Sequence, residues 1–215
     1  MIFQMPVQGK SSNCYILSCD ASKKAVIIDP GSGSDAIMTT LMKEHLDPEL
    51  IILTHGHHDH IGAVEKLRKE LQIKVAVHKK DAEMLINPIK NRSQFWGTNI
   101  TLSPAEICLE DNQKIVIGNM EISVIHTPGH TPGSISLLTD QGLFSGDTLF
   151  DGQVGKTDLP GGSIDDLLSS IHNKLLVLKD DVKVYPGHGG STTIGNERSA
   201  NPYIRYELWK GEISW

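Results

Sequence analysis

The heptapeptide Thr54-His-Gly-His-His-Asp-His60 carries more information about this protein than any other part of its sequence. Four of its side chains are candidate metal ligands: His55, His57, Asp59 and His60. Borderline-soft divalent ions favour imidazole nitrogen and carboxylate oxygen as ligands. The preceding apolar run, Ile51-Ile-Leu53, predicts a buried strand that delivers this loop to a sheet edge, where ligands converge without burying unpaired backbone. The stretch therefore predicts a metal site at a strand exit.

Three later segments add one candidate ligand each, and each segment follows a strand-like run. The added ligands are His130, in a turn rich in glycine and proline, Asp147 and His188. The full set exceeds what one tetrahedral ion can use, which predicts a pair of ions. A carboxylate can bridge two ions, and a water held between them can lose its proton near neutral pH. Hydrolysis is therefore the first hypothesis for the reaction.

The remaining five histidines are not expected to bind the metals. His45 and His172 lie in helical patterns and are expected at the surface. His78 and His126 end strand-like runs, so they could support a ligand or be purely structural. His58 lies between ligands, where a surface position is favoured over coordination.

Composition indicates one globular domain over residues 1–215, with 39% hydrophobic and 21% charged residues. No apolar run approaches the roughly 20 residues of a membrane helix, and the first six residues lack the features of a secretory signal. The formal net charge of −6, without a Lys/Arg run, argues against a nucleic-acid partner. The cysteines Cys14 and Cys19 are expected to be reduced core residues, not a bridge. These features favour a cytoplasmic protein with a small-molecule partner.

Apolar periodicity predicts short strands that alternate with helices. Strands are expected at residues 13–18, 25–28, 51–53, 74–78, 113–117, 120–126, 134–139, 142–144 and 183–185. Helices are expected at residues 34–46, 61–71 and 164–175, the last with Ser163 as its N-cap. Two β-rich halves with flanking helices predict two packed sheets between helical layers. Residues 86–104 are predicted to form a loop over the site, and the aromatic tail from Tyr203 to Trp215 is predicted to pack on the domain.

Five motifs together resemble the metallo-β-lactamase-fold hydrolases, in their short, single-domain glyoxalase II-like branch. They are Thr54-His-Gly-His-His-Asp-His60, Thr127-Pro-Gly-His130, Phe144-Ser-Gly-Asp-Thr-Leu-Phe150, Gly155-Lys-Thr-Asp-Leu-Pro-Gly-Gly162 and Tyr185-Pro-Gly-His188. The resemblance implies an α+β fold, an αββα sandwich of two mixed β-sheets flanked by helices, with the metal site at one sheet edge. It implies that one ion binds His55, His57 and His130, that a second binds Asp59, His60 and His188, and that Asp147 bridges them.

The resemblance also separates branches of the family. True β-lactamases of this fold generally lack a bridging aspartate, so Asp147 disfavours antibiotic hydrolysis. RNA-processing members usually carry an added arm or a second domain, for which 215 residues leave no room. The flavodiiron branch has glutamate where this chain has His57.

For a glyoxalase II-like protein, the implied reaction is hydrolysis of a thioester such as S-D-lactoylglutathione. A metal-bridging hydroxide would attack the carbonyl, Asp59 would orient that hydroxide, and a thiolate would leave without a strong general acid. The implied cofactors are two divalent ions, with zinc as the first choice and iron or manganese as alternatives.

Two departures concern glutathione recognition. The chain is short after His188, where glyoxalase II proper has a helical domain, and it has Gly190 where that enzyme has a tyrosine. Lys156, by contrast, matches a lysine that contacts glutathione in that family, although it could equally be a solvent-exposed loop residue.

Other functions remain open at this stage. A persulfide dioxygenase shares the fold and would hold one iron on His55, His130 and Asp147. A lactone or ester hydrolase could use the same hydroxide. A non-catalytic binding domain is disfavoured because the set of ligands is intact. The oligomeric state is not predicted.

Overall fold

The computed structural model describes residues 1–5 and 12–204, and its centre is a pair of six-stranded mixed sheets. The first sheet has the spatial order β1-β2-β3-β4-β5-β6. Its strands are β1 (Ile2–Met5), β2 (Cys14–Ser18), β3 (Lys24–Ile28), β4 (Asp47–Ile52), β5 (Lys74–His78) and β6 (Ile107–Leu109). The pairs from β1 to β3 are antiparallel and those from β3 to β6 are parallel.

The second sheet has the order β14-β13-β10-β9-β8-β7. Its strands are β7 (Lys114–Ile117), β8 (Met120–His126), β9 (Ile135–Thr139), β10 (Gly142–Gly146), β13 (Lys183–Pro186) and β14 (Thr192–Thr193). Only β10 and β13 pair in parallel among the described strands of this sheet. A small hairpin of β11 (Leu149–Phe150) and β12 (Gln153–Val154) follows β10.

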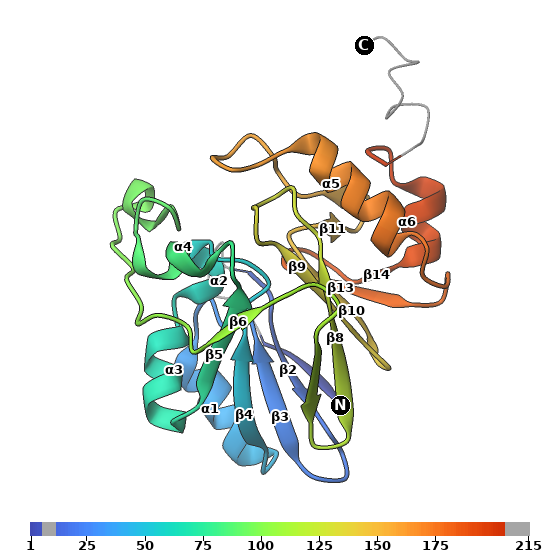
Figure 1. Cartoon of the computed structure of the whole chain (residues 1–215). Helices are drawn as coiled ribbons and strands as arrows, with labels where there is room; N and C mark the ends of the chain where they lie inside the picture. The colour runs from blue at the N-terminus through green and yellow to red at the C-terminus, as the bar shows by residue number, and fades with distance from the viewer. Residues whose placement is uncertain (6–11, 205–215) are drawn as a thin grey trace.

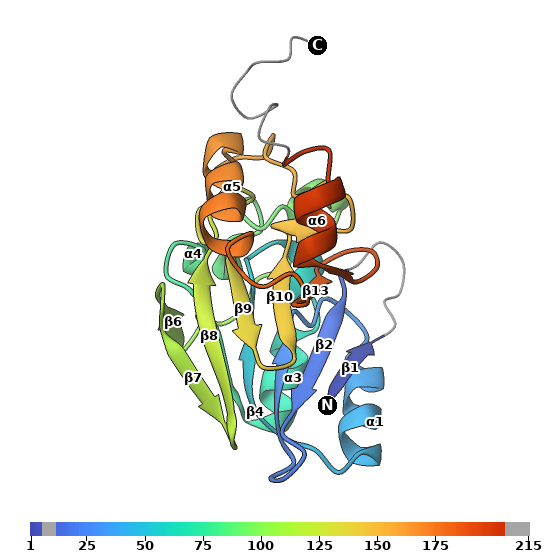
Figure 2. The same ribbon diagram turned by 90° about the vertical axis from the view of Figure 1, so that its right-hand side faces the viewer.

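Helices cover the outer faces of both sheets (Figures 1 and 2). The first sheet is covered by α1 (Ser34–Lys43) and α3 (Val64–Leu71), and the second by α5 (Ile164–Ser170), its one-turn π extension η2 (Ile171–Leu175) and α6 (Ile194–Ala200). Three shorter helices lie between strands: α2 (His58–Ile61), α4 (Ala82–Ile86) and the 3₁₀ helix η1 (Ser93–Trp96). The predicted αββα sandwich is confirmed.

Three apolar layers hold the sandwich together, because successive side chains of a strand point to opposite faces. In β2, Ile16 packs toward the helices and Leu17 toward the other sheet. In β10, Leu143 packs under α5 while Phe144 enters the layer between the sheets. The Phe144 ring stacks on Tyr185, with ring centroids 5.1 Å apart. The central strands of each sheet are therefore buried on both faces.

The strands that matter for function all end at one edge of the sandwich. The carboxyl ends of parallel β3, β4 and β5 share an edge, and so do those of β10 and β13. Loops at such an edge can converge without burying unpaired backbone groups. The candidate ligands predicted from sequence lie in these loops and in the turn after β8.

Most predicted elements are confirmed, some with different bounds. The strands at 74–78 and 120–126 have the predicted limits, and Ser163 caps α5 by accepting a hydrogen bond from the backbone N–H of Asp166. The first helix ends at Lys43, before the predicted limit, because His45 adopts a left-handed backbone with φ of 54°. The strand predicted at 51–53 begins earlier, at Asp47. It accommodates Pro48 at a register shift against β3, where the missing N–H of proline costs little.

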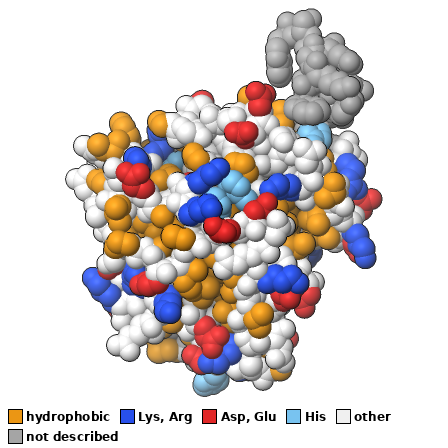
Figure 3. Space-filling view, viewed as in Figure 1, with side chains coloured by type: hydrophobic (Ala, Val, Ile, Leu, Met, Phe, Trp, Pro, Cys, Tyr) orange, Lys and Arg blue, Asp and Glu red, His pale blue; other side chains and the backbone are white. Residues whose placement is uncertain are grey.

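Several smaller predictions can also be compared with the structure. Cys14 is buried in the core, Cys19 is half-buried against the inter-sheet layer, and neither forms a disulfide. The tail prediction concerns residues up to 215, of which 205–215 lie outside the described residues. None of the helices within residues 1–5 and 12–204 combines the length and apolarity needed to cross a membrane. Basic and acidic side chains are interspersed on the face shown in Figure 3.

The buried Phe144 tests the inter-sheet layer. We expect Phe144→Ala to lower the free energy of unfolding by about 3–5 kcal/mol, because it removes a fully buried ring and leaves a cavity. The exposed Val116 on β7 offers a matched control, and Val116→Ala should change stability by less than about 0.5 kcal/mol. Urea unfolding monitored by circular dichroism measures both. Equal effects of the two substitutions would contradict the packing described here.

Candidate metal centre

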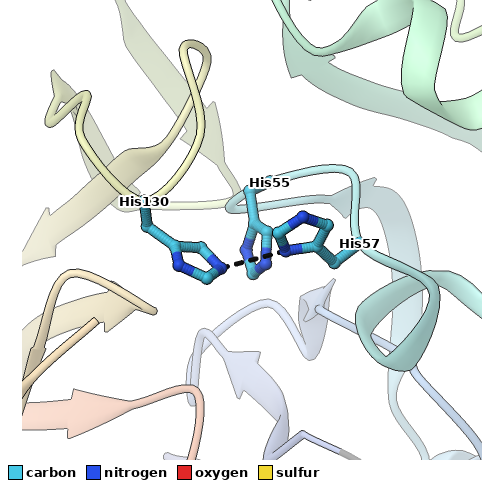
Figure 4. Close-up of side chains that lie close together, drawn as sticks. All are labelled: His55, His57 and His130. Carbon is cyan, nitrogen blue, oxygen red and sulfur yellow. Dashed lines mark hydrogen bonds between the residues drawn. The ribbon is translucent and has the colours of Figure 1, made fainter. Parts of the chain in front are cut away.

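Seven side chains from four loops converge at the strand exits. Their ligand atoms form three overlapping groups, and within each group the atoms lie within 4.8 Å of one another. The groups are His55, His57 and His130; His55, His60 and Asp147; and Asp59, His60 and His188. Figure 4 shows the first group, in which the imidazoles from two loops point toward a common centre. The structure therefore brings together all seven candidates named from the sequence.

Asp147 lies at the centre of this cluster. Its Oδ1 is 3.4 Å from His60 Nε2, and its Oδ2 is 3.5 Å from His130 Nε2. The same Oδ2 is 3.6 Å from His188 Nε2. Asp59 approaches from the other side, with its Oδ2 3.2 Å from His188 Nε2. The two oxygens of one carboxylate thus face histidines on both sides of the cluster.

The polar atoms at the centre suit cations better than one another. His55 Nε2, His60 Nε2 and Asp147 Oδ1 are buried without a hydrogen-bond partner among the described residues. His57 Nδ1 and His130 Nε2 face each other at 2.9 Å. Buried polar atoms without partners are costly, and divalent ions would satisfy imidazole nitrogens and carboxylate oxygens together. The donor set fits a dinuclear metal site.

The outward-facing ring nitrogens have partners that orient the imidazoles. His60 Nδ1 donates to Asp29 Oδ2 at 2.9 Å, and His130 Nδ1 donates to the carbonyl oxygen of Lys156 at 2.7 Å. His55 Nδ1 lies 3.2 Å from the hydroxyl of Thr54, which itself donates to Asp29. With Nδ1 acting as donor, the lone pair of each Nε2 faces the cluster, as metal ligation requires.

Two supporting aspartates were not identified from the sequence. Asp29 follows β3 and also accepts a hydrogen bond from the backbone N–H of Thr54, at 2.7 Å. Asp81 follows β5, is fully buried, and accepts hydrogen bonds from Gly56 N, Gly133 N and Thr131 Oγ1 at 2.7–3.1 Å. Asp81 therefore ties the His55–His57 loop to the His130 turn. Their position in the sequence could have identified them, because both aspartates follow strands that end at the edge where the candidate ligands lie.

Glycine is required at position 187 because Asp147 and His60 lie very close to its Cα atom. A Cβ at this position would lie 2.3 Å from Asp147 Oδ1 and 2.8 Å from His60 Cε1. Real carbon atoms do not approach so closely, so any larger residue would displace a candidate ligand. The glycine before His188 is thus a packing requirement of the cluster.

The electrostatics of the cluster indicate a site prepared for positive charge. Burial would raise the pKa of Asp147, but His60, His130 and His188 hold it down at about 2. Burial would lower the pKa of His60, but Asp147, Asp29 and Asp59 hold it well above its ordinary value. For His57, burial and the neighbouring His130 lower the pKa to about 3. Its ring is therefore neutral and available as a ligand.

A cavity of about 600 Å³ opens above the cluster. It is lined by the cluster residues Asp59, His130, Asp147 and His188, and also by Phe150, Lys156 and Leu159. Arg92 and Trp96 also line it, which confirms that the 86–104 segment lies over the site. Lys156 is exposed at the cavity.

The five excluded histidines belong to none of the ligand groups. His45 is exposed and His172 is partly exposed, as expected. His78 is buried and stacks on His126, with ring centroids 4.1 Å apart. His58 differs from its predicted surface position, because it is half-buried, lines the cavity and stacks on Trp96.

An αββα sandwich with a His/Asp cluster at its strand exits defines a class of metal-dependent hydrolases. Residues 7–188 match the sequence profile of the metallo-beta-lactamase superfamily, and the chain belongs to that superfamily. It is 37% identical over 204 residues to the probable metallo-hydrolase YqgX of Bacillus subtilis, with 94% of this chain and 96% of that protein covered. It is 33% identical to hydroxyacylglutathione hydrolase GloC of Haemophilus influenzae, with 93% and 96% covered.

Solved structures agree with this classification. The chain is 44% identical to BLEG-1, a B3 metallo-beta-lactamase, with a TM-score of 0.91. The match covers 95% of this chain and 100% of the BLEG-1 chain. The chain is 33% identical to TTHA1623 in a di-iron-bound form, with a TM-score of 0.83. The match covers 94% of this chain and 99% of the TTHA1623 chain. The chain is 26% identical to ETHE1 from Myxococcus xanthus, with a TM-score of 0.81. The match covers 100% of this chain and 92% of the ETHE1 chain. The resemblance seen in the sequence is confirmed.

The charge balance of the cluster predicts that metal affinity rises with pH. Burial opposes protonation of His60 and His188, but the neighbouring carboxylates raise the pKa of both, so these rings bind protons more readily in the metal-free protein. A binding cation must displace those protons. Below these pKa values, apparent affinity should fall about tenfold per pH unit for each proton displaced. Competition titrations with a zinc chelator between about pH 6 and pH 8 measure this slope, and a pH-independent affinity would contradict it.

Proposed function

We propose that this protein hydrolyses a small-molecule thioester, with S-D-lactoylglutathione as the first substrate to test. The observation that carries the proposal is the intact seven-residue cluster, five of whose members line a cavity of about 600 Å³. That volume suits a small organic molecule. The likeness to GloC, a hydroxyacylglutathione hydrolase, supports the choice of substrate.

In this proposal the cluster holds two divalent ions. One ion binds His55, His57 and His130, a second binds Asp59, His60 and His188, and Asp147 is shared between them. The central position of the Asp147 carboxylate supports this division. Zinc is our first choice of metal, and the likeness to a di-iron form of TTHA1623 makes iron the alternative.

Bound divalent ions would lower the pKa of a water molecule and polarise the carbonyl of the substrate. The residues of the chain supply orientation and charge. Burial would raise the pKa of Asp59, but His60 and His188 hold it well below its usual range, so its carboxylate is ionised and can accept a hydrogen bond from the attacking water. The leaving thiolate needs no strong general acid, because a cysteine-type thiol has a pKa of about 8.5.

Three other reactions are compatible with the same site. A persulfide dioxygenase would need one iron on His55, His130 and Asp147, and the likeness to ETHE1 keeps this candidate. Hydrolysis of a β-lactam, disfavoured from the sequence on the basis of Asp147, is supported by the 44% identity to BLEG-1. A lactone or other ester is a further substrate of the hydrolytic kind.

The direct experiment measures thiol release from S-D-lactoylglutathione by zinc-loaded protein, with a chelator control. Chelator-sensitive turnover with kcat/KM of about 10⁴ M⁻¹s⁻¹ or more would support the proposal. No turnover by protein that retains two ions would reject this substrate. The same preparation should then be assayed with a chromogenic cephalosporin, a lactone, and a persulfide with oxygen consumption.

Asp147→Ala tests the shared carboxylate. Since both ions would lose a ligand, we expect the bound metal to fall from two ions per chain to fewer than one, with activity reduced at least about 100-fold. The exposed Asp140 provides a control, and Asp140→Ala should leave metal content and activity unchanged. Elemental analysis after dialysis measures the metal content. Two tightly bound ions in the Asp147 variant would rule out the bridging role.

Lys156→Ala tests recognition of glutathione. If the ammonium contacts a glutathione carboxylate, the substitution should raise KM for the glutathione thioester several-fold while barely affecting a neutral aryl ester. Steady-state kinetics with both substrates measures the difference. Equal effects on the two substrates would mean that Lys156 does not read glutathione.

A further inference from the structure

The segment between α4 and β6 borders the cavity through Arg92 and Trp96, and buried Asn91 fixes it there. The side-chain amide of Asn91 donates to the carbonyls of Met84 and Ile100 at 3.0 and 2.9 Å. Its Oδ1 accepts a hydrogen bond from Ser93 N at 3.0 Å. The Asn91 carbonyl accepts a hydrogen bond from the backbone N–H of His58, at 2.9 Å. This segment is therefore joined directly to the loop that carries His57 and Asp59.

Arg92, the next residue, is held in an unusual conformation. Its φ of 68° lies in the left-handed region, which costs about 1 kcal/mol or more for a residue with a side chain. The guanidinium lines the cavity, with Cζ 5.4 Å from the centre of the Phe95 ring. Within residues 1–5 and 12–204, no carboxylate is found within ion-pair distance of Arg92. Nearby Lys90, by contrast, is paired with Glu83 at 2.5 Å.

Lys156, which also lines the cavity, has a similar arrangement. Its backbone carbonyl accepts the hydrogen bond from His130 Nδ1, so its main chain is tied to the cluster. Its ammonium has no carboxylate within ion-pair distance in the described part of the chain. Two cations without carboxylate partners thus border the cavity. The backbone of Lys156, and that of Asn91 next to Arg92, each accept a hydrogen bond from a loop that carries candidate ligands.

Aromatic groups lie beside Arg92. Trp96 lines the cavity and stacks on His58, with ring centroids 5.8 Å apart and an angle of 22° between the planes. The Trp96 and Phe95 side chains are 62% and 67% exposed. Hydrophobic side chains are also visible over α4 and η1 at the left of Figure 3. An apolar shelf with a cation next to it suits a ligand that has both an apolar part and a negative charge.

We infer that Arg92 is a specificity-determining residue that binds an oxyanion on the thiol half of the substrate, while Trp96 packs against its apolar stem. This inference deepens the proposed thioester hydrolysis and rests on it. The substrate class is then an acyl thioester of a small anionic thiol. In this proposal Arg92 and Lys156, which both line the cavity, bind this anionic part, and the acyl carbon lies over Asp59 and Asp147. Guanidinium can bind either a carboxylate or a phosphate in bidentate fashion, so the test must separate these two sources.

The test compares Arg92→Ala with Lys90→Ala, a control two residues away on the same segment. For S-D-lactoylglutathione, Arg92→Ala should raise KM about tenfold or more with kcat changed less than twofold. The neutral S-D-lactoyl-N-acetylcysteamine should show no such change, and Lys90→Ala should match the wild type with both substrates. Arg92→Lys should recover only part of the loss, because ammonium lacks the planar fork. A larger effect on lactoyl-coenzyme A than on lactoylglutathione would identify the oxyanion as a phosphate.

A binding measurement keeps this inference separate from the proposed reaction. S-methylglutathione, which has no thioester to hydrolyse, can be titrated calorimetrically into zinc-loaded protein. A Kd raised about tenfold by Arg92→Ala supports the inference even if no thioester is turned over. If Arg92→Ala turns over lactoylglutathione with an unchanged KM, the role of Arg92 is overturned while the proposed hydrolysis still stands. Equal effects on the anionic and neutral substrates would indicate a structural role and would also overturn it.

Discussion

The position of the Asp147 carboxylate is the constraint on which the rest of the site depends. This carboxylate is largely buried, its two oxygens face different histidines, and its surroundings keep it ionised. A buried charge is tolerated only where opposite charges and hydrogen bonds offset the loss of hydration. Bound cations would supply further opposite charge at this position. Holding one carboxylate between two sets of imidazoles requires four strand exits from two sheets to meet at one edge.

The sandwich meets this requirement through rigid contacts behind the ligands. Asp29 orients His60 directly and His55 through Thr54, so one carboxylate at the end of β3 serves two ligands. Asp81 joins the first ligand loop to the His130 turn. The hydrogen bonds of Asp81 connect loops that belong to different sheets. The inter-sheet apolar layer and the site thus depend on each other, because a shift between the sheets would separate the ligand groups.

The sequence was sufficient for the fold and the metal cluster because both leave strong local signals. Each ligand follows an apolar run, and the spacing within 55–60 is dense enough to be read without a structure. Asp29 and Asp81 gave weaker signals, since a lone aspartate after a strand is common in turns. The short strands β11, β12 and β14 have two residues each and carry no periodicity. The cavity wall at Arg92 and Trp96 depends on side-chain contacts of Asn91, which no pattern in the sequence reveals.

We propose that the substrate is selected by the residues that line the cavity beside the metals. The central claim concerns the metals themselves. Crystals of zinc-loaded protein, measured on both sides of the zinc absorption edge, test it most directly. We expect two anomalous peaks, one for each zinc ion, about 3.5–4 Å apart and with the Asp147 carboxylate between them. A single peak on His55, His130 and Asp147 would contradict it, because one ion there is the arrangement expected of a mononuclear iron enzyme.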